Sequence, residues 1–200
     1  MASALVEAPW PADILERMER AVEKVQDRLM RATSALDAAR VPYAVAGGNA
    51  VAAWVSKIDA GAVRNTRDVD ILLSRVNFEH AKAALEKAGF VYRHVRGLDI
   101  FRDGPEALVR DSVHVLFASE KLTGEELVAN PAIDESERGE AFQVLTLEAL
   151  VRTKLNAWRL KDQVHLQDML DVGLIDETWL GKYPPDLRAR LQYILDNPER

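Results

Sequence analysis

Residues 45–73, which read VAGGNAVAAWVSKIDAGAVRNTRDVDILL, decide the fold of this chain. The stretch opens with an apolar run followed by Gly47 and Gly48, which predicts a strand, a turn and the start of a helix. It closes with Asp68 and Asp70 in an otherwise apolar run that predicts a second strand. Backbone N–H groups at a helix N-terminus bind phosphate, and carboxylates nearby suit the metal ion that accompanies phosphate.

The two aspartates are predicted to act together. They lie two residues apart, so on a strand their side chains point to the same face, about 6.5–7 Å apart. Such a pair of carboxylates suits Mg²⁺ or Mn²⁺, which binds nucleotide phosphates and polarises the one under attack. A structural alternative is that Asp68 caps a turn and that Asp70 pairs with a nearby arginine.

The order of these features resembles the minimal nucleotidyltransferase fold of the polymerase-beta-like superfamily: strand, Gly-Gly turn, helix, Arg-x-Thr-x-Asp-x-Asp, strand. It is most similar to the branch that includes the toxins of abortive-infection type IV toxin–antitoxin systems and related uncharacterised bacterial proteins. The correspondence covers residues 41–173. It implies that Asp68 and Asp70 hold the metal and that the nucleotide contacts Gly47, Gly48, Asn49, Arg64 and Thr66.

One position departs from this family. The family carries a third carboxylate in an apolar-Asp-apolar run on a later strand, and the best match here, residues 112–117, has His114 in its place. Asp111 lies three residues from His114, so on a regular strand it faces the other side. His114 is therefore predicted to complete the catalytic and metal-binding set with Asp68 and Asp70, as ligand or as proton acceptor. The alternative is a half-buried structural histidine.

The C-terminal part is predicted to be helical, over residues 146–160 and 162–172 and again from residue 184. The first of these segments resembles the helix that follows the third ligand strand in the family, and this implies that Lys154 reaches the triphosphate as a point charge. The alternative for Lys154 is a solvent-facing side chain. Asp162 and Asp168 are expected to cap a helix or to pair with Arg152, Arg159 or Lys161, without a chemical role.

The remaining pattern predicts an α/β (α+β) protein with a mixed sheet and flanking helices. A long amphipathic helix over residues 13–40 has its apolar stripe on the sheet or, alternatively, in a seam with a partner; the stripe is Met18, Val22, Val25, Leu29, Ala32 and Leu36. Two parts are expected, a nucleotidyltransferase-like core with this helix at 1–145 and a helical segment packed on it at 146–200.

Composition narrows the class of protein. The chain has 200 residues, a formal net charge of −6 and no cysteine, which excludes disulfides, thiolate zinc sites and cysteine nucleophiles. The acidic balance argues against broad nucleic-acid binding, which depends on clustered Lys and Arg. No apolar run approaches the length of about 20 residues that a membrane helix needs, so a cytoplasmic protein is expected.

The predicted function is metal-dependent transfer of a nucleotidyl group from a nucleoside triphosphate to an acceptor hydroxyl, on a small molecule, a tRNA or a protein. His114 keeps a second class open, in which a catalytically degenerate module of the same fold serves as a sensor or binds a partner. A third alternative is a toxin held by an antitoxin.

Overall fold

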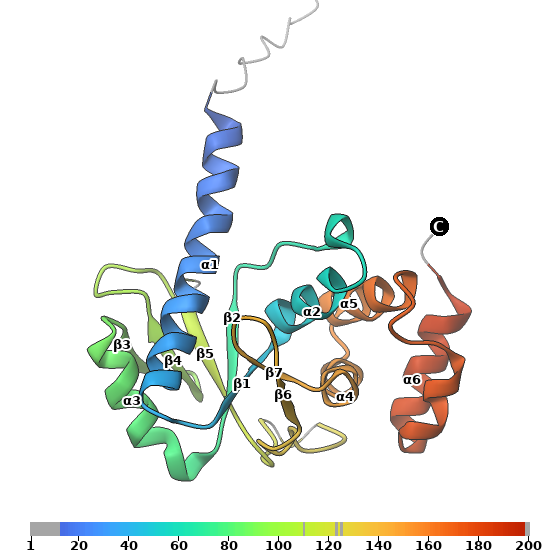
Figure 1. Ribbon diagram of the computed structural model, residues 1–200. Helices are drawn as coiled ribbons and strands as arrows, with labels where there is room; N and C mark the ends of the chain where they lie inside the picture. Colours follow the sequence, from blue (N-terminus) through green and yellow to red (C-terminus); the bar gives the residue numbers. More distant parts are fainter. Residues whose placement is uncertain (1–12, 110, 123, 125, 199–200) are drawn as a thin grey trace, which may run out of the picture.

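The computed structural model describes residues 13–109, 111–122, 124 and 126–198, and these fold into a seven-stranded mixed sheet with helices beside it (Figure 1). The strands are β1 (Tyr43–Ala46), β2 (Val69–Leu73), β3 (Val91–Val95), β4 (Leu98–Arg102), β5 (Ser112–Phe117), β6 (Ser136–Arg138) and β7 (Gln143–Leu145). The α-helices are α1 (Ile14–Ala38), α2 (Gly47–Ser56), α3 (Phe78–Lys87), α4 (Leu147–Ala157), α5 (Leu160–Asp171) and α6 (Pro185–Asp196). Short 3₁₀ turns span Ala60–Ala62, Arg75–Asn77 and Glu177–Lys182.

This architecture confirms the predicted fold class, a mixed α/β sheet with flanking helices. The two parts predicted at 1–145 and 146–200 stay a prediction, and residues 1–12, 110, 123, 125, 199 and 200 of those parts lie outside the described residues. Among the described residues, no helix combines the length and the apolar character that crossing a lipid bilayer requires.

The strand order β3-β4-β5-β2-β1-β7-β6 places β2 between β1 and β5. β2 runs antiparallel to β1 and parallel to β5, and the register sets Asp70 opposite Ala46 on one side and opposite His114 on the other. Ala46 leads directly into Gly47, so the predicted glycine turn, Asp70 and His114 meet at one place on the sheet. Pairing between strands, rather than proximity in sequence, brings them together.

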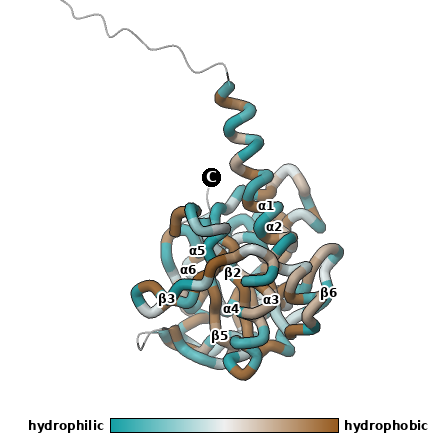
Figure 2. The backbone as a smooth tube through the Cα atoms, turned by 90° about the vertical axis from the view of Figure 1, so that its left-hand side faces the viewer, coloured by the Kyte–Doolittle hydropathy of each residue, from teal (hydrophilic) through white to brown (hydrophobic). Residues whose placement is uncertain are grey.

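The central strands owe their stability to burial. All four residues of β1 are buried, and β2 is buried everywhere except at Asp70. Such continuous apolar runs are typical of strands covered on both faces. In Figure 2 the hydrophobic segments accordingly gather in the interior, around β2, β5 and α4. Asp70 is thus the one polar side chain in a central, otherwise apolar strand.

The helices lie in two groups. α1 and α3 contact each other, and α1 also contacts β2 and β5, whereas α2 contacts β1, β2, α4 and α5. Figure 1 shows α1 and α3 beside β3, β4 and β5, with α2, α4, α5 and α6 on the other side of the view. The second group and the sheet together form the walls of the site described below.

Helix α1 covers the sheet only with its C-terminal half. Leu29, Ala32 and Leu36 are buried, but Met18 of the same apolar stripe is 60% exposed. The helix projects beyond the sheet at its N-terminal end (Figures 1 and 2). The prediction that the whole stripe covers the sheet was therefore wrong for its N-terminal half, because the 25-residue helix is longer than the surface it packs against.

Helix α2 begins directly at Gly47, with Ala46 as its N-cap. One predicted helix end differs from the structure. The helix predicted at 146–160 ends at Ala157, where Trp158 adopts a left-handed conformation with φ of 51°. The chain then restarts as α5 at Leu160, with a side-chain and backbone capping box between Arg159 and Asp162.

The uneven packing of α1 leads to a stability prediction. Leu36→Ala is expected to lower the free energy of unfolding by about 2–5 kcal/mol, because it leaves a cavity in the core. Met18→Ala, on the same stripe, is expected to change it by less than about 0.5 kcal/mol. Urea unfolding followed by circular dichroism measures both. Equal losses would contradict the statement that only the C-terminal half of the stripe is packed.

Candidate functional site

The site begins at the turn between β1 and α2. Gly47 has a φ of +63°, a conformation that side chains disfavour, and it lies against the carboxyl group of Asp70. A Cβ atom at Gly47 would stand 2.7 Å from Cγ of Asp70 and closer still to Oδ2. Only glycine therefore lets the helix start lie directly beside this carboxylate.

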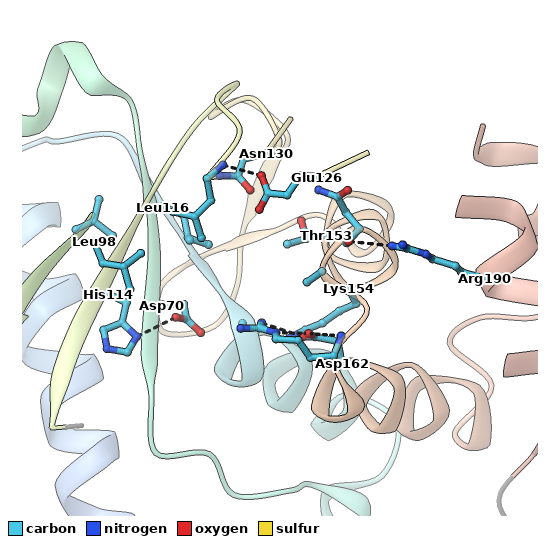
Figure 3. A pocket seen from close by; sticks show the side chains of 16 residues that line it. Asp70, Leu98, His114, Leu116, Glu126, Asn130, Thr153, Lys154, Asp162 and Arg190 are labelled. Carbon is cyan, nitrogen blue, oxygen red and sulfur yellow. Dashed lines mark hydrogen bonds and ion pairs between the residues drawn. The ribbon is translucent and has the colours of Figure 1, made fainter. Parts of the chain in front are cut away.

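Asp70 and His114 form a pair across neighbouring parallel strands. Nδ1 of His114 lies 3.5 Å from Oδ1 of Asp70, and both side chains are partly exposed (Figure 3). The hydrogen bond with Asp70 raises the pKa of His114 above its ordinary value in spite of burial. Burial raises the pKa of Asp70, but His114, Lys154 and Lys161 outweigh it and hold that pKa below its ordinary value. The pair therefore favours an ionised Asp70.

Asp68 lies immediately before β2, and neighbouring elements hold it from two sides. Nδ2 of Asn49 donates to the backbone carbonyl of Asp68 at 2.7 Å. The side chain of Asp68 forms an exposed ion pair with Lys161 of α5, at 3.4 Å from Oδ2 to Nζ. Asn49 thus positions the start of β2. The Asp68 carboxylate remains partly exposed while it pairs with Lys161.

The other predicted nucleotide contacts have structural partners. A Cβ atom at Gly48 would lie 2.7 Å from Oγ1 of Thr66, so these two residues are packed together. Nε of Arg64 donates to both carboxylate oxygens of Asp168 on α5, at 3.0 and 2.9 Å. Arg64 therefore ties the segment before β2 to α5, an ion pair that the expected partners of Asp168 did not include.

These elements surround a pocket of about 450 Å³, which is within the range of about 300–1,000 Å³ typical of small-molecule sites. Gly47, Asp70, His114 and Lys154 line it, whereas Gly48, Asn49, Arg64, Thr66 and Asp68 do not. Figure 3 shows Asp70 and His114 on the sheet side, with Lys154 and Asp162 facing them from the helices. The sheet side supplies a carboxylate and the helical side supplies cations.

Lys154 is not a solvent-facing lysine, since only 3% of it is exposed. Its Nζ atom donates to Oδ1 of Asp162 at 3.0 Å. Burial lowers the pKa of Lys154, and the charges of Asp162 and Asp70 act in the opposite direction. A buried lysine with a carboxylate partner can present a fixed positive charge to a ligand, which an exposed and mobile lysine does not.

Sequence reasoning gave no site role to several of the residues that line the pocket, among them Arg159 and Asp162. The expected pairing of Asp162 with Arg159 is confirmed, at 2.7 Å from Nε to Oδ2. The additional bond from Lys154 was not predicted, because it joins α4 to α5 through a turn that the sequence pattern did not indicate. The i, i+3 spacing of Arg159 and Asp162 was the available signal for a helix start at this point.

Two carboxylates fit a divalent metal here. Across the described residues, no three His, Asp or Glu side chains are grouped closely enough to hold a metal by themselves. Mg²⁺, however, is commonly bound by one or two carboxylates together with substrate phosphates. Asp68 and Asp70 fit that arrangement, because both carboxylates are accessible, with 33% and 22% of their side chains exposed.

Comparison with known proteins finds no matching family model and no matching curated protein. Among solved structures, the chain is similar to a candidate nucleotidyltransferase from H. pylori, with 15% identity, a TM-score of 0.49 and coverage of 88% of this chain and 76% of that one. It is also similar to the solution structure of the antibiotic-resistance factor ANT(2'')-Ia, with 12% identity, a TM-score of 0.44 and coverage of 88% and 83%. A crystal structure of ANT(2'')-Ia with adenylyl-2''-tobramycin gives 13% identity, a TM-score of 0.41 and coverage of 86% and 87%.

The contact between Gly47 and Asp70 can be tested with a matched pair of variants. Gly47→Ala and Gly173→Ala both force alanine into a left-handed conformation, at a cost of about 1–2 kcal/mol, but only Gly47 has an atom within 4 Å of the added Cβ. Thermal unfolding should therefore show a larger loss of stability for Gly47→Ala, because Asp70 must move. Equal losses would mean that the turn does not constrain Asp70.

Proposed function

We propose that this protein binds a nucleoside triphosphate together with Mg²⁺ or Mn²⁺ and transfers its nucleotidyl group to an acceptor hydroxyl. The observation that carries the proposal is the arrangement of Gly47, Asp70, His114 and Lys154 around one pocket, although they come from four different elements. A glycine turn at a helix start, an ionised carboxylate and a fixed cation are groups that suit a metal–triphosphate complex.

The charges of the pocket support a polyphosphate as ligand. Lys154 and Arg159 stand on the helical wall, and the N-terminus of α2 adds the partial positive charge of its free backbone N–H groups. Asp68 and Asp70 are the residues that would hold the metal. The chemistry supplied by a metal held there would be Lewis-acid polarisation of the phosphoryl group under attack. The protein's own task is then to orient the phosphates along the α2 turn and towards the two cations.

His114 is suited to accept the proton of the acceptor hydroxyl. One ring nitrogen faces Asp70, which orients the imidazole and fixes its tautomer, as a carboxylate does for a catalytic histidine. A histidine in this position therefore replaces a third carboxylate by a proton acceptor rather than by a third hard metal ligand. The predicted alternative, in which His114 binds the metal directly, stays a prediction.

A second candidate function is favoured by the same residue. His114, paired with Asp70, occupies the place of the third carboxylate. If it does not support nucleotidyl transfer, the pocket would still bind a nucleotide and the protein would act as a sensor or partner-binding module. The acceptor class, the cytoplasmic location, and the toxin function with its protein antitoxin stay predictions from the sequence.

The metal site is tested with the two aspartates. Asp68→Asn and Asp70→Asn are expected to weaken Mg²⁺-dependent or Mn²⁺-dependent nucleotide binding at least about tenfold, because charge-assisted contacts contribute about 1.5–3 kcal/mol. Calorimetry with each of the four common ribonucleoside triphosphates, with and without metal, measures this. Asp111→Asn is the control, since Asp111 pairs with Arg28 away from the pocket and should bind as the parent does. Unchanged binding in both site variants would place the metal elsewhere.

The role of His114 is tested by transfer of labelled nucleotide to tRNA, to the protein itself and to small hydroxyl compounds. His114→Ala is expected to reduce transfer by about 10²–10⁴-fold, the usual contribution of general acid–base catalysis, with little change in nucleotide binding. An inactive parent that gains turnover through His114→Asp would instead support the sensor function. Transfer that survives His114→Ala undiminished would show that His114 is only structural.

A further inference from the structure

The cation cluster on the helical wall of the pocket is built around one buried carboxylate. Asp162 has no exposed surface, yet its two oxygens accept four hydrogen bonds. Oδ1 accepts from Nζ of Lys154 at 3.0 Å and from Nη2 of Arg159 at 3.4 Å. Oδ2 accepts from Nε of Arg159 at 2.7 Å and from its backbone N–H at 3.3 Å. A charge as deeply buried as this is stable only when it is paired and hydrogen-bonded.

The two partners of Asp162 come from different helices. Lys154 lies in the last turn of α4, and Arg159 is the N-cap of α5. Between them the chain reverses through Trp158, so the spacing of the two cations depends on how the helices are joined. Asp162 bonds to both side chains at once and thereby fixes that spacing.

The cluster carries a net charge of +1 and faces the phosphate-binding elements. Lys154, Arg159 and Asp162 line the same pocket as Gly47 and Asp70. Figure 3 shows Lys154 and Asp162 across the pocket from Asp70. Arg159 has 61% of its side chain exposed, whereas Asp162 is fully buried and Lys154 nearly so, so a ligand in the pocket meets Arg159 first. Lys154 lines the same pocket from its buried side, and the carboxylate lies between the two cations.

The charge state of Lys154 also depends on this carboxylate. Burial lowers the pKa of Lys154, and the positive charge of Arg159 lowers it further. The negative charges of Asp162 and Asp70 raise the same pKa. His165 of α5 also interacts electrostatically with Lys154, and its own pKa is lowered to about 4, mainly by burial, so it is uncharged at neutral pH. Removing the charge of Asp162 leaves Asp70 as the main group that favours the protonated lysine, so Lys154 then loses its proton at a lower pH.

We infer that Asp162 is a positioning residue that holds Lys154 and Arg159 as a two-cation clamp for the distal phosphates of a triphosphate. The inference rests on the proposed function and deepens it, because it assigns the end of the pocket that receives the leaving pyrophosphate. Inorganic triphosphate carries more negative charge than orthophosphate and offers several phosphate groups to the two cations, so the clamp contributes more to its binding. Asp162 itself touches no substrate in this scheme.

The test uses the full chain and two probes that carry no base, inorganic triphosphate and orthophosphate, with calorimetry at pH 7 and pH 9. Asp162→Asn is expected to weaken triphosphate binding about tenfold at pH 7 and orthophosphate binding by a smaller factor, because orthophosphate carries less charge. Raising the pH from 7 to 9 should weaken triphosphate binding more in this variant than in the parent, because Lys154 without the charge of Asp162 loses its proton at a lower pH. A merely structural role of Asp162 does not produce that pH dependence.

Two further variants keep the result interpretable. Asp171→Asn makes the same change on the same helix, at a carboxylate that accepts a hydrogen bond from Gln167 and does not line the pocket, and should behave as the parent does. Asp162→Glu keeps the charge but moves the carboxylate, so it should weaken triphosphate binding without the additional loss at pH 9. It also provides the decisive result if thermal unfolding shows that Asp162→Asn is not folded.

The outcomes separate this inference from the proposed function. Unreduced triphosphate affinity in either folded Asp162 variant overturns the clamp. A parent that binds nucleoside triphosphates but not inorganic triphosphate also overturns the clamp and leaves the proposed function standing. A parent that binds neither ligand overturns both.

Discussion

The position of β2 between β1 and β5 is the constraint on which the rest of the site depends. Antiparallel pairing with β1 brings the Gly47 turn against Asp70, and parallel pairing with β5 brings His114 beside the same carboxylate. A shift of one residue in either register would turn Asp70 into the core and an apolar side chain into the pocket. The apolar neighbours of Asp70 in β2 are buried, so the hydrophobic core fixes the register, and the register in turn fixes the chemistry.

The charged groups of the site already have partners before any ligand binds. Asp70 faces His114, Asp68 faces Lys161, and Asp162 holds Lys154 with Arg159. Such pairing lets a fold place several charges in a partly buried pocket without the large cost of isolated ions. A metal–triphosphate complex brings both signs of charge, so it can engage the carboxylates of the sheet side and the cations of the helical side together. That complementarity favours this ligand over a neutral metabolite or a free anion.

The sequence predicted the sheet side of the site better than the helical side. Gly47, Asp70 and His114 could be located because strand periodicity and the glycine pair are local signals, and pairing of neighbouring strands then brought them together. The burial of Lys154 could not be predicted, because it depends on the left-handed turn at Trp158 and on how α4 meets α5. The exposed N-terminal half of α1 was missed for a related reason, since a regular apolar repeat does not reveal how long a surface the sheet offers. The sequence indicated the chemical type of Lys154 and of the apolar side chains of α1, but not which elements they contact.

The central claim, that one pocket holds a divalent metal and a triphosphate between the sheet and the helices, is tested most directly by a crystal structure. Crystals grown with Mn²⁺ and a non-hydrolysable nucleoside triphosphate would be measured at the manganese absorption edge. The account predicts an anomalous peak within coordination distance of the carboxylates of Asp68 and Asp70, with the distal phosphates directed towards Lys154 and Arg159. A nucleotide bound outside this pocket, or a manganese peak that contacts neither aspartate, would contradict it.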